Sequence, residues 1–454
     1  MDKSVSTITI LGTGYVGIST AAIFAAAGYK VYLVDVIPAR LESVRQGKAF
    51  FYEEGLDPLI ADGVNKGMII PTDSYAESIP HSQVVISCVG TPDNPDGSSN
   101  LRYVFAAAEE ASQYLGSDTI FVQKSTVPVG TGEQVEAAMA KSGKTIHYVS
   151  NPEFLRESTA VLDTLWFDRI VLGGTDTSAI DRVMNIYKTV AAKRDDIAKV
   201  AGIAPPTKAL PEEYIATTRN SAELIKVTAN AFLALKISFA NSIAKLADAS
   251  NADINEVMNA VGADPRIGRA FLNAGRGYGG GCFPKDVSGL ISSGVQHGVD
   301  LDIMDAVMQV NNSMPGYIAE KLQDALGGSF EGKRIAVLGL SFKAGTSDTR
   351  RSSAITLANI FAGAKATVTA YDPESNEEAA PDLTSSVTLR DDLASAITGV
   401  DAIVVATDWA EFVDTPANRY AELAPQAVFV DCMNRFSSPN ITSAGLSYIG
   451  VGRR

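Results

Sequence analysis

The stretch TITILGTGYVG, residues 7–17, decides the fold of the first part of this chain. Residues 7–11 are a short apolar run that predicts a buried strand, and Gly12, Gly14 and Gly17 follow it in the spacing GxGxxG. An alanine-rich segment, residues 19–27, predicts the helix that comes next. A strand, a glycine turn and a helix in this order predict a dinucleotide-binding unit within a parallel α/β sheet.

An acidic residue completes this pattern. Asp35 follows Gly17 by 18 residues and ends the next predicted strand, residues 30–36. Glycines let the backbone approach a pyrophosphate, the helix N-terminus supplies N–H donors, and an acid at this spacing accepts hydrogen bonds from ribose hydroxyls. A bare GxGxxG also occurs in ordinary turns, but the full context predicts NAD binding. The negative charge of Asp35 disfavours the 2′-phosphate of NADP.

The alternation of strands and helices extends over both halves of the chain. Further strands are predicted at residues 83–89, 119–123, 146–150 and 169–172. Residues 193–213, with three prolines, predict a loop, and the apolar residues 221–249 predict one long helix buried on several sides. A second alternating unit has predicted strands at residues 334–339, 367–371, 402–406 and 427–431, and a predicted helix at 353–363.

These elements predict an α/β fold with two Rossmann-like parallel-sheet domains joined by a central helical domain that contains one long helix. The expected boundaries are residues 1–212, 213–318 and 319–454, in line with two or three cores for a chain of 454 residues.

Composition narrows the class of protein. With 38 basic and 52 acidic residues the net charge is −14, which disfavours general binding to nucleic acid or to an anionic membrane. Residues 1–7 are polar and the apolar stretches are shorter than the ~18 residues of a membrane span, so we expect a cytoplasmic protein. The three cysteines and three histidines are scattered, so we expect no disulfide framework and no metal site. Acid–base chemistry would then use Lys, Asp, Glu, Thr or Cys.

Two further segments have the residue types of a reaction centre. The segment GYGGGCFPKD, residues 277–286, places Cys282 three residues before Lys285 and four before Asp286. A lone cysteine is often an inert buried residue, but a nearby lysine can favour the nucleophilic thiolate, and the spacing leaves both readings open. Lys226 and Asn230 are one turn apart on the predicted long helix. They form either a solvated stripe or a buried pair beside a ligand.

The second α/β unit lacks an equivalent glycine fingerprint. Its first predicted strand leads into Gly339–Lys343 as GLSFK, and the segment Asp348-Thr349-Arg350-Arg351 follows. The unit is either a structural duplicate or a sheet that binds a second, nucleotide-like phosphate ligand through Lys343 and Arg350. We favour the second interpretation, because a duplicated unit without the glycines usually binds something else.

Together, these segments resemble the UDP-glucose/GDP-mannose dehydrogenase family from Ile8 to about Phe436. The resemblance rests on long motifs in the family order: GTGYVG (12–17), YEEGL (52–56), GTP (90–92), KSTVP (124–128), NPEFLRE (151–157), ELIK (223–226), NAFLA (230–234), DPRIG (264–268), GGGCFPKD (279–286) and FK (342–343).

The resemblance implies a four-electron oxidation of the C6 alcohol of UDP-glucose to UDP-glucuronate, with two NAD as cofactor and no release of the aldehyde. Lys226 and Asp286, the latter through a water, would handle the hydroxyl proton, and Lys226 with Asn230 would stabilise the oxyanion. Cys282 would form a thiohemiacetal and then a thioester. Glu153 would serve hydrolysis, with Thr126 placing the water.

The resemblance also implies two sets of ligand contacts. The positions expected to bind the cofactor are Gly12, Gly14, Tyr15, Val16, Gly17, Asp35, Arg40, Gly90, Thr91, Pro92, Ser125, Thr126, Glu157, Lys285 and Arg350. Those expected to bind the nucleotide sugar are Glu153, Phe154, Leu155, Glu157, Lys226, Asn230, Arg266, Asn273, Tyr278, Gly279, Phe342, Lys343 and Arg435.

Some features differ from the family pattern or leave alternatives. Gly281 stands where the family usually has Ser, and Cys432–Arg435 (CMNR) replaces a Gly-Arg-type segment. The same chemistry on GDP-mannose or a UDP-N-acetylhexosamine is an alternative, and a catalytically silent NAD-binding interaction protein is a distant one. The resemblance implies a homodimer or a higher homo-oligomer, in which the long helix forms the interface and Arg266 reaches the neighbouring sugar site.

Overall fold

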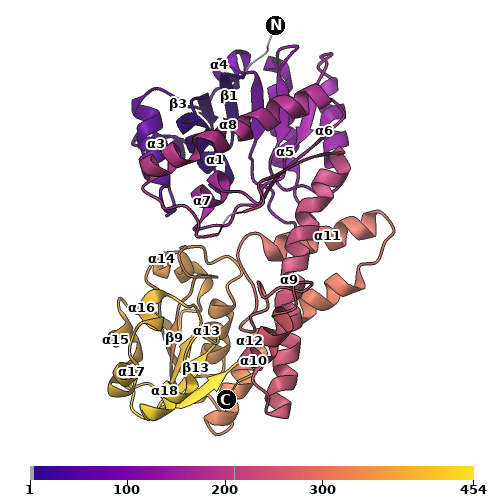
Figure 1. The fold of residues 1–454 in the computed structure, drawn as a ribbon. Helices are drawn as coiled ribbons and strands as arrows, with labels where there is room; N and C mark the ends of the chain where they lie inside the picture. Colours follow the sequence, from indigo (N-terminus) through magenta and orange to yellow (C-terminus); the bar gives the residue numbers. More distant parts are fainter. Residues whose placement is uncertain (1–4, 209, 454) are drawn as a thin grey trace. The chain divides into compact units, whose positions relative to one another are not determined.

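Strand β1 (Thr7–Leu11) lies inside an eight-stranded sheet with the order β3-β2-β1-β4-β5-β6-β7-β8. The computed structural model describes residues 5–208 and 210–453. The chain divides into two units, Met1–Ala229 and Asn230–Arg454, and each contains one of the sheets seen in Figure 1. The other strands of the first sheet are β2 (Lys30–Val34), β3 (Ile69–Thr72), β4 (Val84–Ser87), β5 (Ile120–Gln123), β6 (His147–Ser150), β7 (Arg169–Gly174) and β8 (Glu213–Thr217).

Helices cover both faces of the first sheet, which buries its strands on two sides. They are α1 (Tyr15–Ala26), α2 (Pro38–Arg45), α3 (Leu56–Asn65), α4 (Tyr75–Ser78), α5 (Arg102–Tyr114), α6 (Thr131–Ala140), α7 (Ala160–Leu165) and α8 (Thr177–Ala201), with a 3₁₀ turn at Ile79–His81. Ile120 and Val122 face the core under α1, α3 and α8, whereas Phe121 faces the core under α5 and α6. Burial on both faces explains the continuous apolar runs in the sequence.

The first sheet is not fully parallel as expected, because β6 and β7 pair antiparallel. The connecting helix α7 has six residues and rises about 9 Å, less than the roughly 13 Å length of a four-residue strand. Strand β7 starts at the edge of the sheet where β6 ends, after a connection in which α7 is the only helix. Strands β7 and β8 pair parallel to each other and extend the sheet.

The predicted loop at residues 193–213 is wrong in its first part. Helix α8 runs on to Ala201 and ends at Gly202, whose left-handed φ of +72° is typical of a glycine that ends a helix. The connection to β8 is therefore shorter than expected.

The second sheet is entirely parallel, with the order β11-β10-β9-β12-β13-β14. Its strands are β9 (Arg334–Leu338), β10 (Thr367–Tyr371), β11 (Val387–Leu389), β12 (Ala402–Val405), β13 (Val428–Asp431) and β14 (Ser447–Gly450). The helices around it are α13 (Ser353–Gly363), α14 (Asn376–Ala379), α15 (Leu393–Ile397), α16 (Ala410–Val413), α17 (Ala417–Leu423) and α18 (Ser438–Ser443), with a 3₁₀ turn at Ala380–Asp382.

The long helix is α9 (Arg219–Ser250), two residues longer at its start and one at its end than predicted. Three further helices follow: α10 (Ile254–Gly262), α11 (Phe283–Gln296) and α12 (Asp302–Ala325). Ala240, Ala244 and Ala247 of α9 pack in one core with α12 and the second sheet. The expected architecture of two α/β domains and a central helical domain is confirmed, while the expected residue boundaries of the three domains stay a prediction.

Among the described residues, α9 alone has the length and composition of a membrane-spanning helix, with a mean hydropathy of 1.2 in an 18-residue window. This differs from the expectation that no stretch would qualify. Of that window 44% is buried within the structure, and a core helix of a soluble protein passes the same test. One such helix is weak evidence of a membrane segment.

Candidate active site

The glycine turn after β1 has the geometry of a phosphate cradle. Gly12 has φ +98°, and a Cβ there would lie 2.9 Å from the carbonyl oxygen of Cys88. A Cβ on Gly17 would lie 1.9 Å from the carbonyl oxygen of Gly12, so only glycine lets α1 approach the strand this closely. A Cβ on Gly14, the residue before α1, would meet open space. The turn therefore fits the pyrophosphate of a dinucleotide bound at the start of α1.

Asp35 lies directly after β2, beside this turn. One carboxylate oxygen accepts hydrogen bonds from the backbone N–H of Thr13, at 2.7 Å, and from its hydroxyl. The other oxygen accepts from the N–H of Ile37 at 2.9 Å, and a guanidinium nitrogen of Arg40 lies 3.7 Å from Asp35. Asp35 is thus fixed at the carboxyl end of its strand, where a ribose is held in this type of sheet.

The other predicted cofactor residues of the first unit follow neighbouring strands at the same edge. Gly90, Thr91 and Pro92 come after β4, and Ser125 and Thr126 come after β5. The hydroxyl of Ser125 donates to the carbonyl of Val89 at 2.7 Å, which joins the two loops.

Lys226 and Glu153 meet in the first unit. Lys226 Nζ lies 3.3 Å from Glu153 Oε1, and both side chains are buried. The second Glu153 oxygen accepts from the N–H of Leu155 at 2.8 Å. The ring of Phe154 has the Arg169 guanidinium 4.0 Å and Lys226 Nζ 5.4 Å from its centroid. Of the two readings of Lys226, the structure supports the buried one.

Glu53 was missed by the sequence reasoning, although the YEEGL motif contains it. Its buried carboxylate accepts from the backbone N–H groups of Ser158, at 2.9 Å, and Ala160, at 2.6 Å, and from the hydroxyl of Tyr15. It ties the segment after Glu153 to the first turn of α1. The sign in the sequence was a pair of neighbouring acidic residues, Glu53 and Glu54. The two backbone N–H groups that Glu53 binds are 105 and 107 residues away in sequence.

Glu223 is a second missed residue, one turn before Lys226 on α9. Its carboxylate accepts from the N–H groups of Gly130 and Gly132, both at 2.7 Å, at the start of α6. Burial raises its pKa to about 7, although these two donors and the Arg219 charge act in the opposite direction. A Cβ on Gly132 would lie 2.7 Å from the Glu223 carboxylate, so glycine is needed for this contact.

In the second unit, Asn230 and Lys285 both contact the buried carboxylate of Asp286. Asn230 Nδ2 donates to Asp286 Oδ2 at 2.6 Å, and Lys285 Nζ lies 2.5 Å from Asp286 Oδ1. Asp286 is 3% exposed and belongs to the first turn of α11. Lys226 and Asn230 are thus one turn apart on α9, and each has an acidic partner of its own.

Cys282 immediately precedes α11, and its carbonyl accepts the N–H of Asp286 at 2.8 Å. Cys282 is exposed, whereas Cys88 and Cys432 are buried. Burial raises the pKa of both buried thiols to about 12, which leaves them protonated at neutral pH. A helix N-terminus favours a negative charge, so Cys282 has the placement that a reactive thiol needs.

The glycine loop before Cys282 is packed too closely for side chains. A Cβ on Gly281 would lie 2.5 Å from the guanidinium of Arg350, and a Cβ on Gly280 would lie 2.8 Å from the ring of Phe342. Arg350 therefore occupies the space of the side chain that Gly281 lacks. Its guanidinium also donates to Asp348, with Nη2 2.6 Å from the carboxylate oxygen Oδ2.

Of the remaining substrate candidates, Glu157 lies half-buried in the first unit and the others lie in the second. Lys343 Nζ lies 5.7 Å from the centroid of the Phe342 ring, and Tyr278 is buried. Asn273 and Arg266 are exposed, and Arg266 pairs with Asp264 at 2.5 Å. Arg435, with a side chain 56% exposed, lies 3.4 Å from a carboxylate oxygen of Asp408.

The second unit repeats part of the first fingerprint in a form that sequence reasoning overlooked. Gly339 after β9 has φ +89°, and Asp372 after β10 accepts from the N–H groups of Leu340, at 2.7 Å, and Ser341, at 3.0 Å. These positions mirror Gly12 and Asp35. The buried carboxylate of Asp372 already accepts these two backbone N–H groups, and it also accepts the indole N–H of Trp409 at 3.1 Å.

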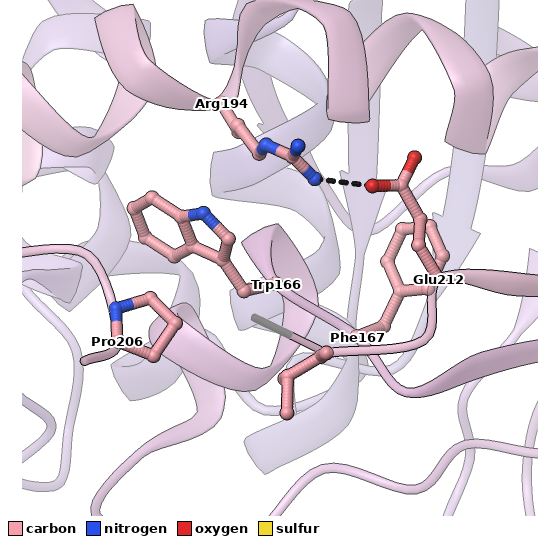
Figure 2. Close-up of a pocket in the computed structure, with 6 residues that line it drawn as sticks. Trp166, Phe167, Arg194, Pro206 and Glu212 are labelled. Atoms are coloured by element: carbon pink, nitrogen blue, oxygen red, sulfur yellow. Dashed lines mark hydrogen bonds and ion pairs between the residues drawn. The ribbon is translucent and has the colours of Figure 1, made fainter. Parts of the chain in front are cut away.

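A pocket of about 260 Å³ lies elsewhere in the first unit (Figure 2). Its lining residues are Trp166, Phe167, Arg194, Pro206, Leu210 and Glu212, and Arg194 pairs with Glu212 at 2.5 Å. None of the residues predicted for catalysis or ligand binding lines it. Over residues 5–208 and 210–453, no group of His, Cys, Asp and Glu could hold a metal ion.

Comparison with known proteins accounts for most of the chain. Residues 6–191 match the NAD-binding domain of the UDP-glucose/GDP-mannose dehydrogenase family, residues 220–313 its central domain, and residues 336–438 its UDP-binding domain. The chain is 36% identical over 451 residues to the UDP-glucose 6-dehydrogenase of Rhizobium meliloti, covering 98% of this chain and 99% of that protein.

Two solved structures are similar over nearly their full lengths. The UDP-glucose dehydrogenase of Pyrobaculum islandicum has a TM-score of 0.88 and 34% identity, covering 100% of this chain and 99% of that one. The UDP-D-ManNAc dehydrogenase of Pyrococcus horikoshii has a TM-score of 0.84 and 25% identity, covering 98% and 99%.

Proposed function

Because the chain belongs to the UDP-glucose/GDP-mannose dehydrogenase family, we propose that it oxidises the C6 alcohol of UDP-glucose to a carboxylate. UDP-glucose, two NAD⁺ and one water give UDP-glucuronate, two NADH and protons. The similarity to a UDP-glucose 6-dehydrogenase along 98% of the chain supports this choice of substrate.

One structural observation carries the chemical part of the proposal. The exposed Cys282 lies at the start of α11, one turn before an Asp286 that is held by Asn230 and Lys285. A nucleophile and a carboxylate one turn apart at the start of α11, with a neutral donor from α9 on the carboxylate, are suited to oxidation of an alcohol through a covalent intermediate.

The first oxidation needs a proton acceptor and a cation. We assign the C6 hydroxyl proton to Asp286 through a water, and stabilisation of the developing oxyanion to Lys226 and Asn230. A buried ammonium is effective here because the low local dielectric strengthens its field at the reacting oxygen.

The second oxidation requires that the aldehyde stays bound. The thiolate of Cys282 adds to the aldehyde carbon, and a C–S bond forms as the C=O π bond opens. The oxygen takes back, through the water, the proton that Asp286 received in the first step, which gives a thiohemiacetal. Loss of a second hydride and of the hydroxyl proton gives a thioester. Glu153 then takes a proton from a water placed by Thr126, and attack of this water breaks the C–S bond and releases the acid and the thiol.

NAD supplies the hydride acceptor for both steps when it is bound. The turn Gly12–Gly17, as GTGYVG, would hold its pyrophosphate, and Asp35 would hold its ribose. We assign four side chains to binding of the nucleotide sugar: Phe154, Tyr278, Phe342 and Lys343.

An assay of NADH at 340 nm with a panel of nucleotide sugars tests this function. We expect two NADH per UDP-glucose and much lower rates with GDP-mannose or UDP-N-acetylhexosamines. Preference for a UDP-N-acetylhexosamine, the substrate class named for the Pyrococcus horikoshii relative, would shift the assignment within the family. No NADH with any nucleotide sugar would favour a silent NAD-binding protein.

We also propose a homodimer built on α9. Phe232, Phe239 and Leu246 are 60%, 49% and 63% exposed and follow one another at intervals of seven residues. Side chains at this interval lie on one face of a helix, and large apolar residues exposed in a row indicate an interface. A second copy of the same helix is the partner that matches this face, and the exposed Arg266 would reach the neighbouring site.

The proposed reaction uses NAD and a nucleotide sugar, both cytoplasmic metabolites, so we place the protein in the cytoplasm. The acidic balance of the chain supports neither nucleic acid nor an anionic membrane as a partner.

A further inference from the structure

Arg276 lies in the middle of the loop formed by residues 273–279, which we call the glycine loop below. It is the largest fully buried side chain of the described residues, with 1% of its surface exposed. Burial lowers its pKa to about 10, so it stays charged at neutral pH. A buried guanidinium costs stability unless its N–H groups all find acceptors. A buried charge of this cost inside the second unit therefore indicates that Arg276 has a function there.

The acceptors of Arg276 are carbonyl and hydroxyl oxygens. Its Nη2 donates to the carbonyls of Ser341 and Phe342 and to the hydroxyl of Thr407, each at 2.9 Å. Its Nη1 donates to the hydroxyls of Ser352 and Ser353 at 3.3 and 3.4 Å. One guanidinium thus joins the segments after β9 and β12 to the start of α13.

The backbone of the same loop is fixed as well. The N–H of Arg276 donates to the carbonyl of Cys432 at 3.0 Å, and the N–H of Gly275 donates to Asn241 of α9 at 2.8 Å. A Cβ on Gly275 would lie 2.7 Å from the Cys432 oxygen. The loop is therefore bound to the carboxyl end of β13 as well as to α9.

These contacts surround the residues assigned above to the nucleotide sugar. Ser341 and Phe342 directly precede Lys343, while Tyr278 and Gly279 follow Arg276 by two and three residues. In open α/β sheets, ligands bind outside the carboxyl ends of the strands, where Arg276 donates its hydrogen bonds. The guanidinium of Arg276 itself donates its hydrogen bonds to protein groups.

We propose that Arg276 is a positioning residue for the nucleotide-sugar site, whose guanidinium holds the turn 340–343 and the glycine loop 273–279 in the single geometry that binds the nucleoside diphosphate. The inference rests on the proposed function and extends it to a residue that touches neither substrate nor cofactor. Its charge is necessary because one planar fork must satisfy several carbonyls and hydroxyls at once, which a lysine cannot do.

The test is calorimetric titration of the full chain with UDP and, separately, with NAD. Arg276→Met and Arg276→Lys are compared with the wild type and with Arg334→Met, a matched substitution of an exposed arginine at the opposite end of β9. We expect the Kd for UDP to rise roughly tenfold or more in both Arg276 variants, since buried charged hydrogen bonds are lost. The Kd for NAD should change less than about twofold, and the KM for UDP-glucose should rise more than kcat falls.

Chemical rescue separates positioning from general stability. In Arg276→Ala, added guanidinium should restore UDP affinity by filling the vacated site, and the same concentration should leave Arg334→Met unchanged. If Arg276→Met does not fold, the UDP affinity of Arg276→Lys and the rescue of Arg276→Ala by guanidinium test the inference instead. Folded Arg276 variants that bind UDP as the wild type does would overturn the inference. A wild type that binds NAD but not UDP would instead overturn the proposed substrate class.

Discussion

The ammonium group of Lys226 lies 3.3 Å from a carboxylate oxygen of Glu153, and the two side chains are only 5% and 8% exposed. Removing two charges from water costs several kcal/mol per ion, roughly, and a close pair recovers part of that cost. In the proposed mechanism both groups serve the same carbon, Lys226 at the oxyanion and Glu153 at thioester hydrolysis.

Replacement of Lys226 by methionine should lower kcat by two to three orders of magnitude, about 3–4 kcal/mol of transition-state stabilisation, with a smaller effect on KM. The substitution also leaves a buried Glu153 charge, so the thermal midpoint should fall. Lys226→Met with Glu153→Gln should recover stability but not activity. A variant that changed only KM would make Lys226 a binding residue.

Asp35 should determine the choice between NAD and NADP. Its carboxylate is fixed by Thr13 and by the N–H of Ile37, so a 2′-phosphate would meet a held negative charge. We expect kcat/KM with NAD to exceed that with NADP by orders of magnitude, and Asp35→Ser to narrow the gap mainly by improving NADP. Equal values for the two cofactors in the wild type would refute the assignment.

Glu223 should make stability depend on pH. Its pKa is about 7 in the folded chain, against 4.5 for an ordinary glutamate, so the folded state holds a proton that the unfolded chain has released between these values. The contribution of this carboxyl is therefore present below pH 4.5 and lost as pH rises through 7, by as much as about 3 kcal/mol.

The charged and titratable groups facing it are Arg219, Glu133 and Tyr148. Thermal unfolding between pH 5 and 8, in steps of about half a unit, should show a wild type that loses stability relative to Glu223→Gln. Glu109→Gln, which changes an exposed glutamate of α5 away from Glu223, is the control. Parallel curves for wild type and Glu223→Gln would contradict the shift.

Phe239→Glu should dissociate the proposed dimer, because it places a charge in the middle of the exposed apolar face of α9. Sedimentation should then give a monomer with lower activity, while Leu210→Glu, an exposed apolar position outside this face, should leave the mass unchanged. A wild type that is monomeric and fully active at assay concentration would exclude the interface.

How much the sequence predicts depends on the range of the interactions. The central strands and α13 were predicted to within one or two residues, since apolar runs and glycine turns are local signals. Strands β3, β8, β11 and β14 were not predicted, because edge and near-edge strands are short and carry no continuous apolar run. Strand β7 was predicted at residues 169–172, but its antiparallel direction was not, because the composition of a strand does not determine its direction.

The site shows the same division. The glycine turn with Asp35 follows a motif of known spacing, whereas the hydrogen bond between Asn230 and Asp286 joins two motifs that are 56 residues apart and was not predicted. The roles of Glu53, Glu223 and Arg276 could not be seen in sequence, because the groups they bind lie far along the chain and include many backbone N–H and carbonyl groups. Backbone groups leave no residue-type signal.

The covalent intermediate on Cys282 is the central claim, and intact-protein mass spectrometry of Glu153→Gln tests it most directly. With Glu153 neutral, both hydride transfers should proceed and hydrolysis should be slow, so mixing with UDP-glucose and NAD should add the mass of a UDP-glucuronyl group. Peptide mapping should place it at Cys282, and Cys282→Ala should give no adduct and no uronate. Absence of an adduct, together with near wild-type acid formation by Cys282→Ala, would contradict the account.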